Sequence, residues 1–86
     1  MYLRLSNDCV IPKNEIIGIF DMDNTTVSRQ GREFLPRAER DGQIVYTSSE
    51  LPKSYVVTEA AGRKRVYLSP LSSKILTARV KTAALL

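Results

Sequence analysis

The chain has 86 residues, of which 43% are hydrophobic and 26% charged, a balance typical of one small folded domain rather than a disordered segment. A single cysteine and the lack of histidine rule out a disulfide within the chain and argue against a structural zinc site, a Ser-His triad or a Cys-His pair. Thirteen Lys and Arg against nine Asp and Glu give a formal charge of +4, which permits a nucleic-acid partner without requiring one.

The chain also lacks the features of a membrane protein. No apolar run approaches the roughly 18 residues that a membrane-spanning helix needs. Residues 1–9 lack the charged and then apolar layout of a secretory signal. We therefore expect a cytoplasmic protein with no membrane partner.

Three short strands are predicted in the first part of the chain. Residues 2–5 alternate in polarity, residues 9–11 form a possible return strand, and residues 16–20 are an apolar run of strand length. Gly18 interrupts the third strand and indicates a bulge or a close contact with another backbone. Residues 21–26 then form a polar turn.

Residues 28–40 show the spacing of a helix, for which the Ser28 hydroxyl is the predicted N-cap. Pro36 is expected to kink this helix or to delay its start, because proline lacks an amide donor. Gly42 suits a left-handed cap at the end. The predicted apolar sector comprises Gly31, Phe34, Leu35 and Ala38. The opposite, charged sector comprises Arg29, Arg32, Glu33, Arg37 and Arg40.

The second part of the chain predicts three more strands and a helix. The strands cover residues 43–47, 54–58 and 63–68, and residues 60–62 form the turn of a hairpin between the last two. Ser69 and Pro70 then predict a helix start, as a capping hydroxyl followed by proline at the first helical position. The expected buried stripe of this helix is Leu71, Ile75 and Ala78, with Leu76 as an optional member, and Lys74, Arg79 and Lys81 are expected in solvent.

These elements predict one α+β domain over residues 1–86, in the order β-β-β-α-β-β-β-α. The sheet is expected to be mainly antiparallel, with two helices. The apolar residues 82–86 form either a frayed tail or a contact surface.

The polar turn contains Asp21-Met22-Asp23-Asn24-Thr25, the D-x-D-x-T pattern typical of haloacid-dehalogenase-type phosphohydrolases. Such an enzyme places its aspartates at the end of a central parallel strand and completes a magnesium shell with a further acidic pair. The later acids of this chain are Glu33, Glu39, Asp41, Glu50 and Glu59, none of them a paired motif. With so few residues for a doubly wound sheet, we favour the alternative, a polar turn that leads into the following helix.

Five sequence blocks occur in order: "MYLRL", "NEIIGIFDMDNTTVS", "REFL", "ELPKSYVVT" and "VYLSPLSSKIL". From Met1 to about Arg79 they resemble the RemB-like branch of the RemA/RemB family of bacterial extracellular-matrix regulators. The resemblance implies a cytoplasmic, non-enzymatic protein that acts on transcription of matrix and biofilm genes. For the RemA branch it implies DNA binding by ring-shaped assemblies.

Two positions depart from the RemA pattern. RemA-like members carry an arginine-rich stretch just before the strand at residues 55–58, where this chain has Leu51, Pro52 and Lys53. They also carry an arginine just before the strand that begins at residue 16, where this chain has Glu15, with Lys13 nearby. The resemblance therefore supports a shared fold and assembly more directly than shared DNA binding.

Clustered cations are the candidate DNA-binding residues, because each neutralised phosphate releases counterions. The set is Lys13, Arg29, Arg32, Arg40, Lys53, Arg63, Lys64 and Arg65. Two of the three residues 63–65 should point to the same side of their strand. The alternative interpretation is a solvated helix face, with Glu33 and Arg37 as an i,i+4 pair, and a charged edge strand.

The tyrosines and Cys9 are interpreted mainly as structural. Tyr2, Tyr46, Tyr55 and Tyr67 could stack on nucleic-acid bases, but filling a small core or an interface is the favoured interpretation. Cys9 is interpreted as a small buried hydrophobe. Self-association, including a ring, would stabilise so small a domain, with the Gly18 strand and residues 83–86 as candidate contacts.

Three functional hypotheses follow. The first is a RemB-like regulator that binds double-stranded DNA through basic residues displayed on a homo-oligomer. The second is an oligomeric interaction protein without DNA affinity, and the third is a magnesium-dependent phosphohydrolase. Under the first two we expect no catalytic residue, metal, cofactor or small-molecule substrate.

Overall fold

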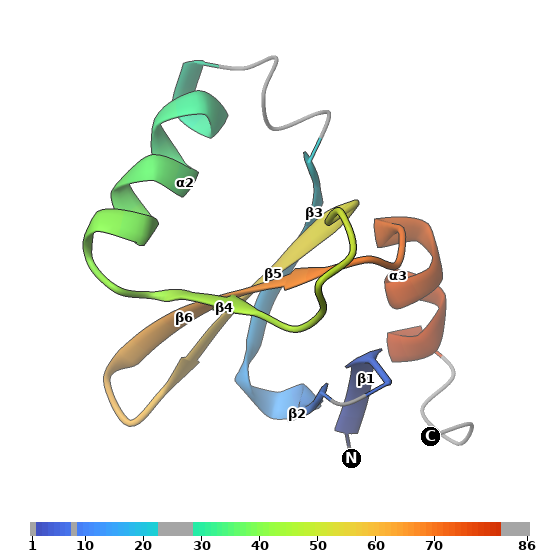
Figure 1. Ribbon diagram of the computed structural model, residues 1–86. Helices are drawn as coiled ribbons and strands as arrows, with labels where there is room; N and C mark the ends of the chain where they lie inside the picture. The colour runs from blue at the N-terminus through green and yellow to red at the C-terminus, as the bar shows by residue number, and fades with distance from the viewer. Residues whose placement is uncertain (1, 8, 23–28, 82–86) are drawn as a thin grey trace.

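The computed structural model describes residues 2–7, 9–22 and 29–81, with the side chains of residues 29–34 outside that description. Its chain order agrees with the predicted alternation of strands and helices (Figure 1). The elements are β1 (Tyr2–Ser6), β2 (Cys9–Pro12), the short 3-10 helix η1 (Lys13–Glu15), β3 (Ile16–Asp21), α2 (Arg29–Arg40), β4 (Ile44–Tyr46), β5 (Ser54–Ala60), β6 (Arg63–Ser69) and α3 (Ser73–Lys81).

The described strands form a four-stranded sheet in the order β3-β5-β6-β4 and a separate ribbon of β1 with β2. β5 pairs antiparallel with both β3 and β6, whereas β4 pairs parallel with β6. β3 and β4 lie at opposite edges of the sheet and run in the same direction, and the crossover connection between them carries α2. The predicted α+β class with mainly antiparallel pairing is confirmed.

Both faces of the sheet are covered by other elements. Side chains of a strand alternate between the two faces, so each strand contributes residues to both. Val56 and Tyr67 point to the face that packs against the β1–β2 ribbon and α3. Tyr55, Val66 and Leu68 point to the opposite face, where α2 packs. Figure 1 shows α2 and α3 on opposite sides of the sheet. Two small apolar clusters therefore hold the domain together.

The end of α2 follows the predicted glycine cap. Gly42 has a φ of +70°, and its amide donates to the Glu39 carbonyl at 3.1 Å. The amide of Gln43 donates to the Ala38 carbonyl at 2.9 Å, which completes a Schellman motif. The helix runs through Pro36 without interruption, so the expected late start is wrong. The predicted N-cap, Ser28, lies outside the described residues, as does Phe34 at the side-chain level.

The predicted start of α3 at Ser69 and Pro70 is wrong, because Ser69 is the last residue of β6. Its hydroxyl donates to the Leu5 carbonyl at 2.6 Å and accepts the Leu71 amide at 3.1 Å, so it bridges to β1 instead of capping a helix. The helix begins at Ser73, where the Ser72 hydroxyl accepts the Ile75 amide at 3.2 Å. Ser72 is therefore the N-cap.

The later start also changes which side of α3 is buried. Leu76 is fully buried, and Val80, one turn further on, packs against the same apolar cluster. Leu71 packs there as well, from a position before the helix. Ile75 is 45% exposed and Ala78 is exposed, so their predicted place in the buried stripe is wrong.

Strand β3 contains the predicted bulge. The register with β5 shifts between Ile16 and Gly18. A β-carbon on Gly18 would lie 2.7 Å from two ring carbons of Phe20, and that ring stacks on Tyr55 with centroids 5.2 Å apart. The close contact at Gly18 is therefore with an aromatic side chain.

The burial of α3 predicts different costs for two neighbouring truncations. Leu76→Ala should lower the free energy of unfolding by about 2–5 kcal/mol, because it leaves a cavity between α3 and the sheet. Ile75→Ala should lower it by less than about 1 kcal/mol, since the side chain is half in solvent. Urea denaturation followed by circular dichroism measures both. Equal losses would contradict the helix phase described above.

Candidate nucleic-acid interface

Asp21, the first residue of the aspartate motif, does not lie at the end of a central parallel strand, where a phosphohydrolase needs it. Asp21 ends β3, an edge strand that pairs antiparallel with β5. Its carboxylate accepts a hydrogen bond from the Ser73 hydroxyl at the start of α3. Residues 23–25 of the motif lie outside the described residues, and within the described part no three His, Cys, Asp or Glu residues gather to hold a metal ion. The visible role of Asp21 is to tie β3 to α3.

The β5–β6 hairpin is longer than the strands beside it. β3 pairs with β5 only as far as Thr58, and β4 pairs with β6 only from Val66 onward. Residues 59–65, here called the hairpin arm, therefore project as a two-stranded ribbon, seen at the lower left of Figure 1. Every residue of the hairpin arm is exposed. Its two-residue turn, Ala61 and Gly62, has positive φ at both positions, as a type I′ turn requires.

Three of the candidate cations lie on the hairpin arm. Arg63 and Arg65 lie on one side, as predicted from strand alternation, and Lys64 lies on the other, opposite Glu59. A hydrogen bond with the Tyr67 side chain, then the charge of that group and more weakly that of Glu15, raises the pKa of Arg65. Like other arginine side chains, its guanidinium is positive at every physiological pH.

The end of α2 adds cations at the root of the hairpin arm. Arg37 and Arg40 are exposed in the last turn of the helix. The chain then turns at Gln43, whose carbonyl accepts the Val66 amide of β6 at 2.8 Å. The structure therefore brings Arg40 to the same end of the sheet as the hairpin arm. Glu39 and Asp41 stand on either side of Arg40 along the chain and reduce the net positive charge of this segment.

The other predicted cations lie elsewhere. Lys53 precedes β5 and lies at the opposite end of that strand from the hairpin arm, about 20 Å away at the usual rise of a strand. The Lys13 ammonium donates to the carbonyls of Arg79 and Val80 at 3.1 and 3.3 Å, so it caps the end of α3. Arg29 and Arg32 belong to the first turns of α2, and their side chains lie outside the described part.

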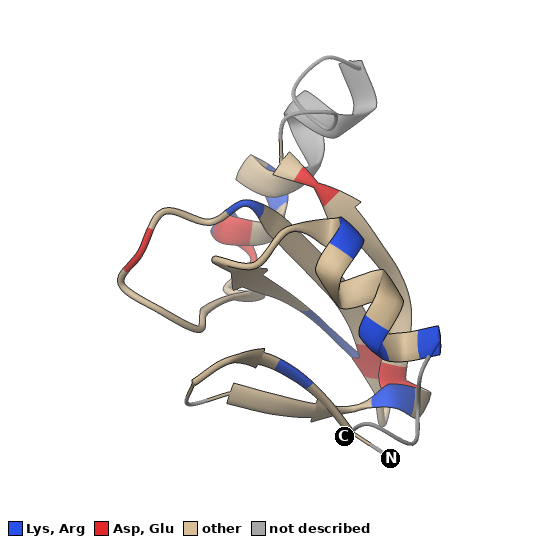
Figure 2. Cartoon of the chain, turned by 90° about the vertical axis from the view of Figure 1, so that its right-hand side faces the viewer, with Lys and Arg blue, Asp and Glu red and all other residues tan. Residues whose placement is uncertain are grey.

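A second basic surface consists of cations of α3 that were predicted from the sequence only to lie in solvent. α3 carries Lys74, Arg79 and Lys81 and contains no acidic residue. Figure 2 shows these basic positions along the helix. Arg4 of β1 lies beside them, because an Arg79 Nη1 donates to the Arg4 carbonyl at 3.2 Å. The sequence signal that could have predicted this basic surface is the lack of acidic residues over residues 73–81.

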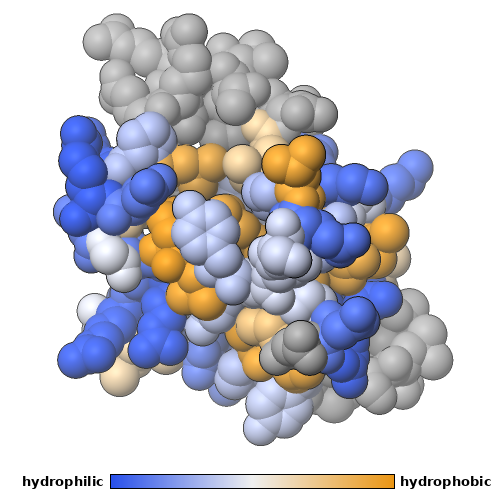
Figure 3. Space-filling model, in the orientation of Figure 1, coloured by the Kyte–Doolittle hydropathy of each residue, from blue (hydrophilic) through white to orange (hydrophobic). Residues whose placement is uncertain are grey.

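The surface also exposes apolar side chains at the sheet edges. On β3, Ile17 and Phe20 are 57% and 44% exposed, and on β4, Tyr46 is 66% exposed. Figure 3 shows apolar residues in the middle of the visible face and hydrophilic ones along its left edge. Tyr55 and Tyr67 are buried, so the interpretation of the tyrosines as core residues is right for these two.

Cys9 agrees with its interpretation as a small apolar residue. It is half-buried and packs against the cluster beneath α3. Burial raises the pKa of its thiol, which disfavours the reactive thiolate. No helix of the described part is both long enough and apolar enough to cross a membrane.

Fold and surface together define a small basic α+β domain whose distinctive chemistry lies in exposed cations. Over 81 residues, the chain is 36% identical to extracellular matrix regulatory protein B of Bacillus subtilis (strain 168), an alignment that covers 94% of this chain and 91% of that protein. The chain belongs to the family of that protein, in agreement with the sequence blocks. No family model matches the chain.

The position of Lys13 predicts a structural cost for its removal. Lys13→Met should lower the free energy of unfolding by about 1 kcal/mol, because two carbonyls at the negative end of α3 lose a charged donor. Lys64→Met removes the same charge from the exposed hairpin arm and should change stability by less than about 0.5 kcal/mol. Thermal and urea denaturation measure the difference. Identical stabilities would contradict the capping role.

Proposed function

We propose that the protein is a regulator of extracellular-matrix and biofilm genes that binds double-stranded DNA through the hairpin arm, as part of a homo-oligomer. Its relationship to a protein named an extracellular matrix regulatory protein supports the regulatory role. The observation that carries the DNA-binding part is the projection of Arg63, Lys64 and Arg65 on an exposed two-stranded ribbon.

The shape of the hairpin arm suits a nucleic acid. A two-stranded ribbon is one of the structures that the major groove of DNA admits. Arg63 and Arg65 share one side of the ribbon, and each planar guanidinium can bind a phosphate through two hydrogen bonds. Lys64 faces Glu59 across the ladder, so its charge is partly balanced. We therefore assign the main phosphate contacts to the two arginines, with Arg40 at the root of the arm.

Self-association would compensate for the small number of cations on one arm. β3 is an edge strand that exposes Ile17 and Phe20, and such an edge offers both backbone groups and apolar area to another copy. Several arms on one assembly would bind neighbouring phosphates with a high effective concentration. The same apolar residues favour the second hypothesis, an oligomeric interaction protein without DNA affinity.

The DNA-binding proposal predicts a salt dependence that belongs to the hairpin arm. Duplex affinity of the unaltered protein should fall linearly on a log–log plot against salt, with a slope of about −0.9 per neutralised phosphate. The triple variant Arg63→Gln, Lys64→Gln, Arg65→Gln should lose about two to three units of that slope per bound arm. Fluorescence anisotropy with a labelled duplex measures both.

The matched control removes cations from the other basic surface. Lys74→Gln with Lys81→Gln should leave most of the slope in place. Absence of duplex binding at low salt would overturn the proposal, and so would an unchanged slope in the arm variant. If the control variant loses the slope instead, the interface is α3 and the assignment to the hairpin arm is wrong.

The assembly predicts a molar mass above that of one chain in light scattering. Ile17→Lys with Phe20→Ser should shift the protein toward the monomer, because a charge and a lost ring disrupt the exposed edge of β3. Leu51→Ser, a substitution of an apolar residue that is 87% exposed in the β4–β5 loop, is the control and should leave the mass unchanged. A monomer both with and without DNA would contradict the homo-oligomer.

That the protein has no enzymatic activity stays a prediction.

A further inference from the structure

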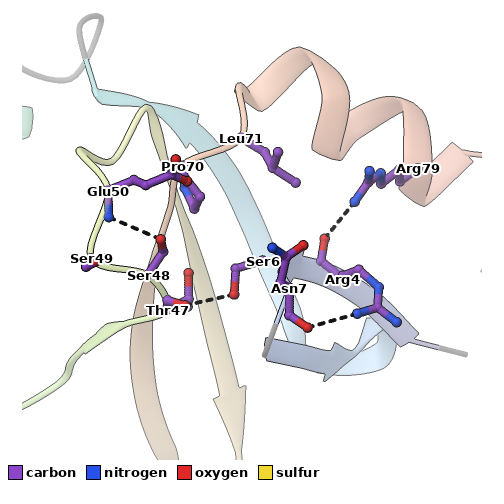
Figure 4. A pocket seen from close by; sticks show the side chains of 10 residues that line it. All are labelled: Arg4, Ser6, Asn7, Thr47, Ser48, Ser49, Glu50, Pro70, Leu71 and Arg79. Atoms are coloured by element: carbon purple, nitrogen blue, oxygen red, sulfur yellow. Dashed lines mark hydrogen bonds between the residues drawn. The ribbon is translucent and has the colours of Figure 1, made fainter.

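A small polar pocket opens where four segments far apart in the sequence meet (Figure 4). It has a volume of about 270 Å³ and lies between the β1–β2 turn, the β4–β5 loop, the residues after β6, and α3. Ligand pockets for drug-sized molecules run from about 300 to 1,000 Å³. This pocket is therefore matched to a small molecule of a few functional groups.

Two arginines line one end of the pocket. An Nη1 atom of Arg79 donates to the Arg4 carbonyl at 3.2 Å, and an Nη1 atom of Arg4 donates to the Asn7 carbonyl at 3.2 Å. Among the described residues, neither guanidinium is paired with a carboxylate. Each guanidinium has five N–H donors in a planar fork that fits phosphate. This end is therefore suited to an anion.

The opposite end of the pocket has different chemistry. Figure 4 places Ser48, Ser49 and Glu50 across the pocket from Arg4 and Arg79. Glu50 is the one acidic residue among the described residues of the lining, and the Ser48 hydroxyl accepts the Glu50 amide at 3.1 Å, which shapes the loop. A carboxylate accepts hydrogen bonds from hydroxyl or amino groups and repels an anion. A fitting ligand thus has an anionic end and a hydroxyl-bearing end.

The walls of the pocket are held in place before any ligand arrives. The Ser6 hydroxyl donates to the Thr47 carbonyl at 2.8 Å and joins segments 41 residues apart. The Thr47 hydroxyl donates to the Leu68 carbonyl at 2.6 Å, and the bond from Arg79 to Arg4 joins residues 75 positions apart. Such preorganisation lowers the entropy lost on binding.

From this arrangement we infer that the pocket binds a small phosphorylated polyol, such as a sugar phosphate or a nucleoside monophosphate. The arginine end holds the phosphate, and the end at Glu50 holds the hydroxyl groups. The inference does not depend on DNA binding by the hairpin arm, because none of residues 59–65 lines the pocket.

Isothermal titration at constant ionic strength tests the pocket with ribose 5-phosphate, adenosine 5′-monophosphate, inorganic phosphate and ribose. The phosphate esters should bind more tightly than inorganic phosphate or ribose alone. Arg4→Gln and Arg79→Gln should each weaken the esters by about tenfold to a hundredfold, as expected for lost charged hydrogen bonds. Glu50→Gln should reduce the preference for the esters over inorganic phosphate.

The control is Lys74→Gln, which removes one positive charge from α3 outside the pocket lining and should leave the affinity for the esters unchanged. Because Arg79→Gln also removes a tie between α3 and β1, amide chemical shifts of the unaltered protein give a second readout. Ribose 5-phosphate should shift the amides of Asn7 and Ser48 saturably.

Three results would overturn the inference. The first is the absence of saturable binding by either phosphate ester. The second is equal weakening by Lys74→Gln, which would assign the binding to diffuse charge. The third is a loss of duplex DNA binding in Arg4→Gln without binding of the esters, which would mean that the phosphate read by the pocket belongs to a DNA backbone.

Discussion

The antiparallel ladder between β5 and β6 supports every other part of the domain. It runs through seven residue pairs, from Ser54 with Ser69 to Ala60 with Arg63, and β3 and β4 attach to its two outer edges. Ser54 and Ser69 are fully buried, and their hydroxyls donate to the carbonyls of Leu71 and Leu5 at 2.7 and 2.6 Å. Buried hydroxyls need such partners, so this end of the ladder determines where β1 and the segment before α3 must lie.

Because the strands differ in length, the two ends of that ladder have different surroundings and different proposed roles. At the serine end, β3 and β4 pair with the ladder, and α3 and the β1–β2 ribbon pack against it. At the other end the ladder outlasts β3 and β4, so it projects as the hairpin arm with three cations. The hairpin is therefore anchored in the domain at its base and exposes its charged tip to a binding partner. The pocket lies at the base, separate from the arm.

Much of the fold was predictable because it depends on local patterns. Alternation located the strands, glycine located the cap of α2 and the turn of the hairpin, and the bulge lay at Gly18. Ranking the cations was less successful. Strand alternation correctly placed Arg63 and Arg65 together, but the predicted DNA-binding set also included Lys53, which lies before the far end of β5, and Lys13, whose donors are used by α3. Charge in a sequence carries no information about which atoms it meets.

By itself, the sequence determined the class of fold, the order of its elements and the family, because these follow from periodicity, turn chemistry and matching blocks. Only the tertiary structure decided which partner each polar side chain bonds to. The Ser69 hydroxyl had the right place to cap a helix, but it donates its hydrogen bond to the carbonyl of Leu5, 64 residues away, so α3 starts later and buries Leu76 instead of Ile75. The pocket likewise joins Arg4 to Arg79. A side chain with several possible partners bonds to the one that packing of distant segments brings within reach.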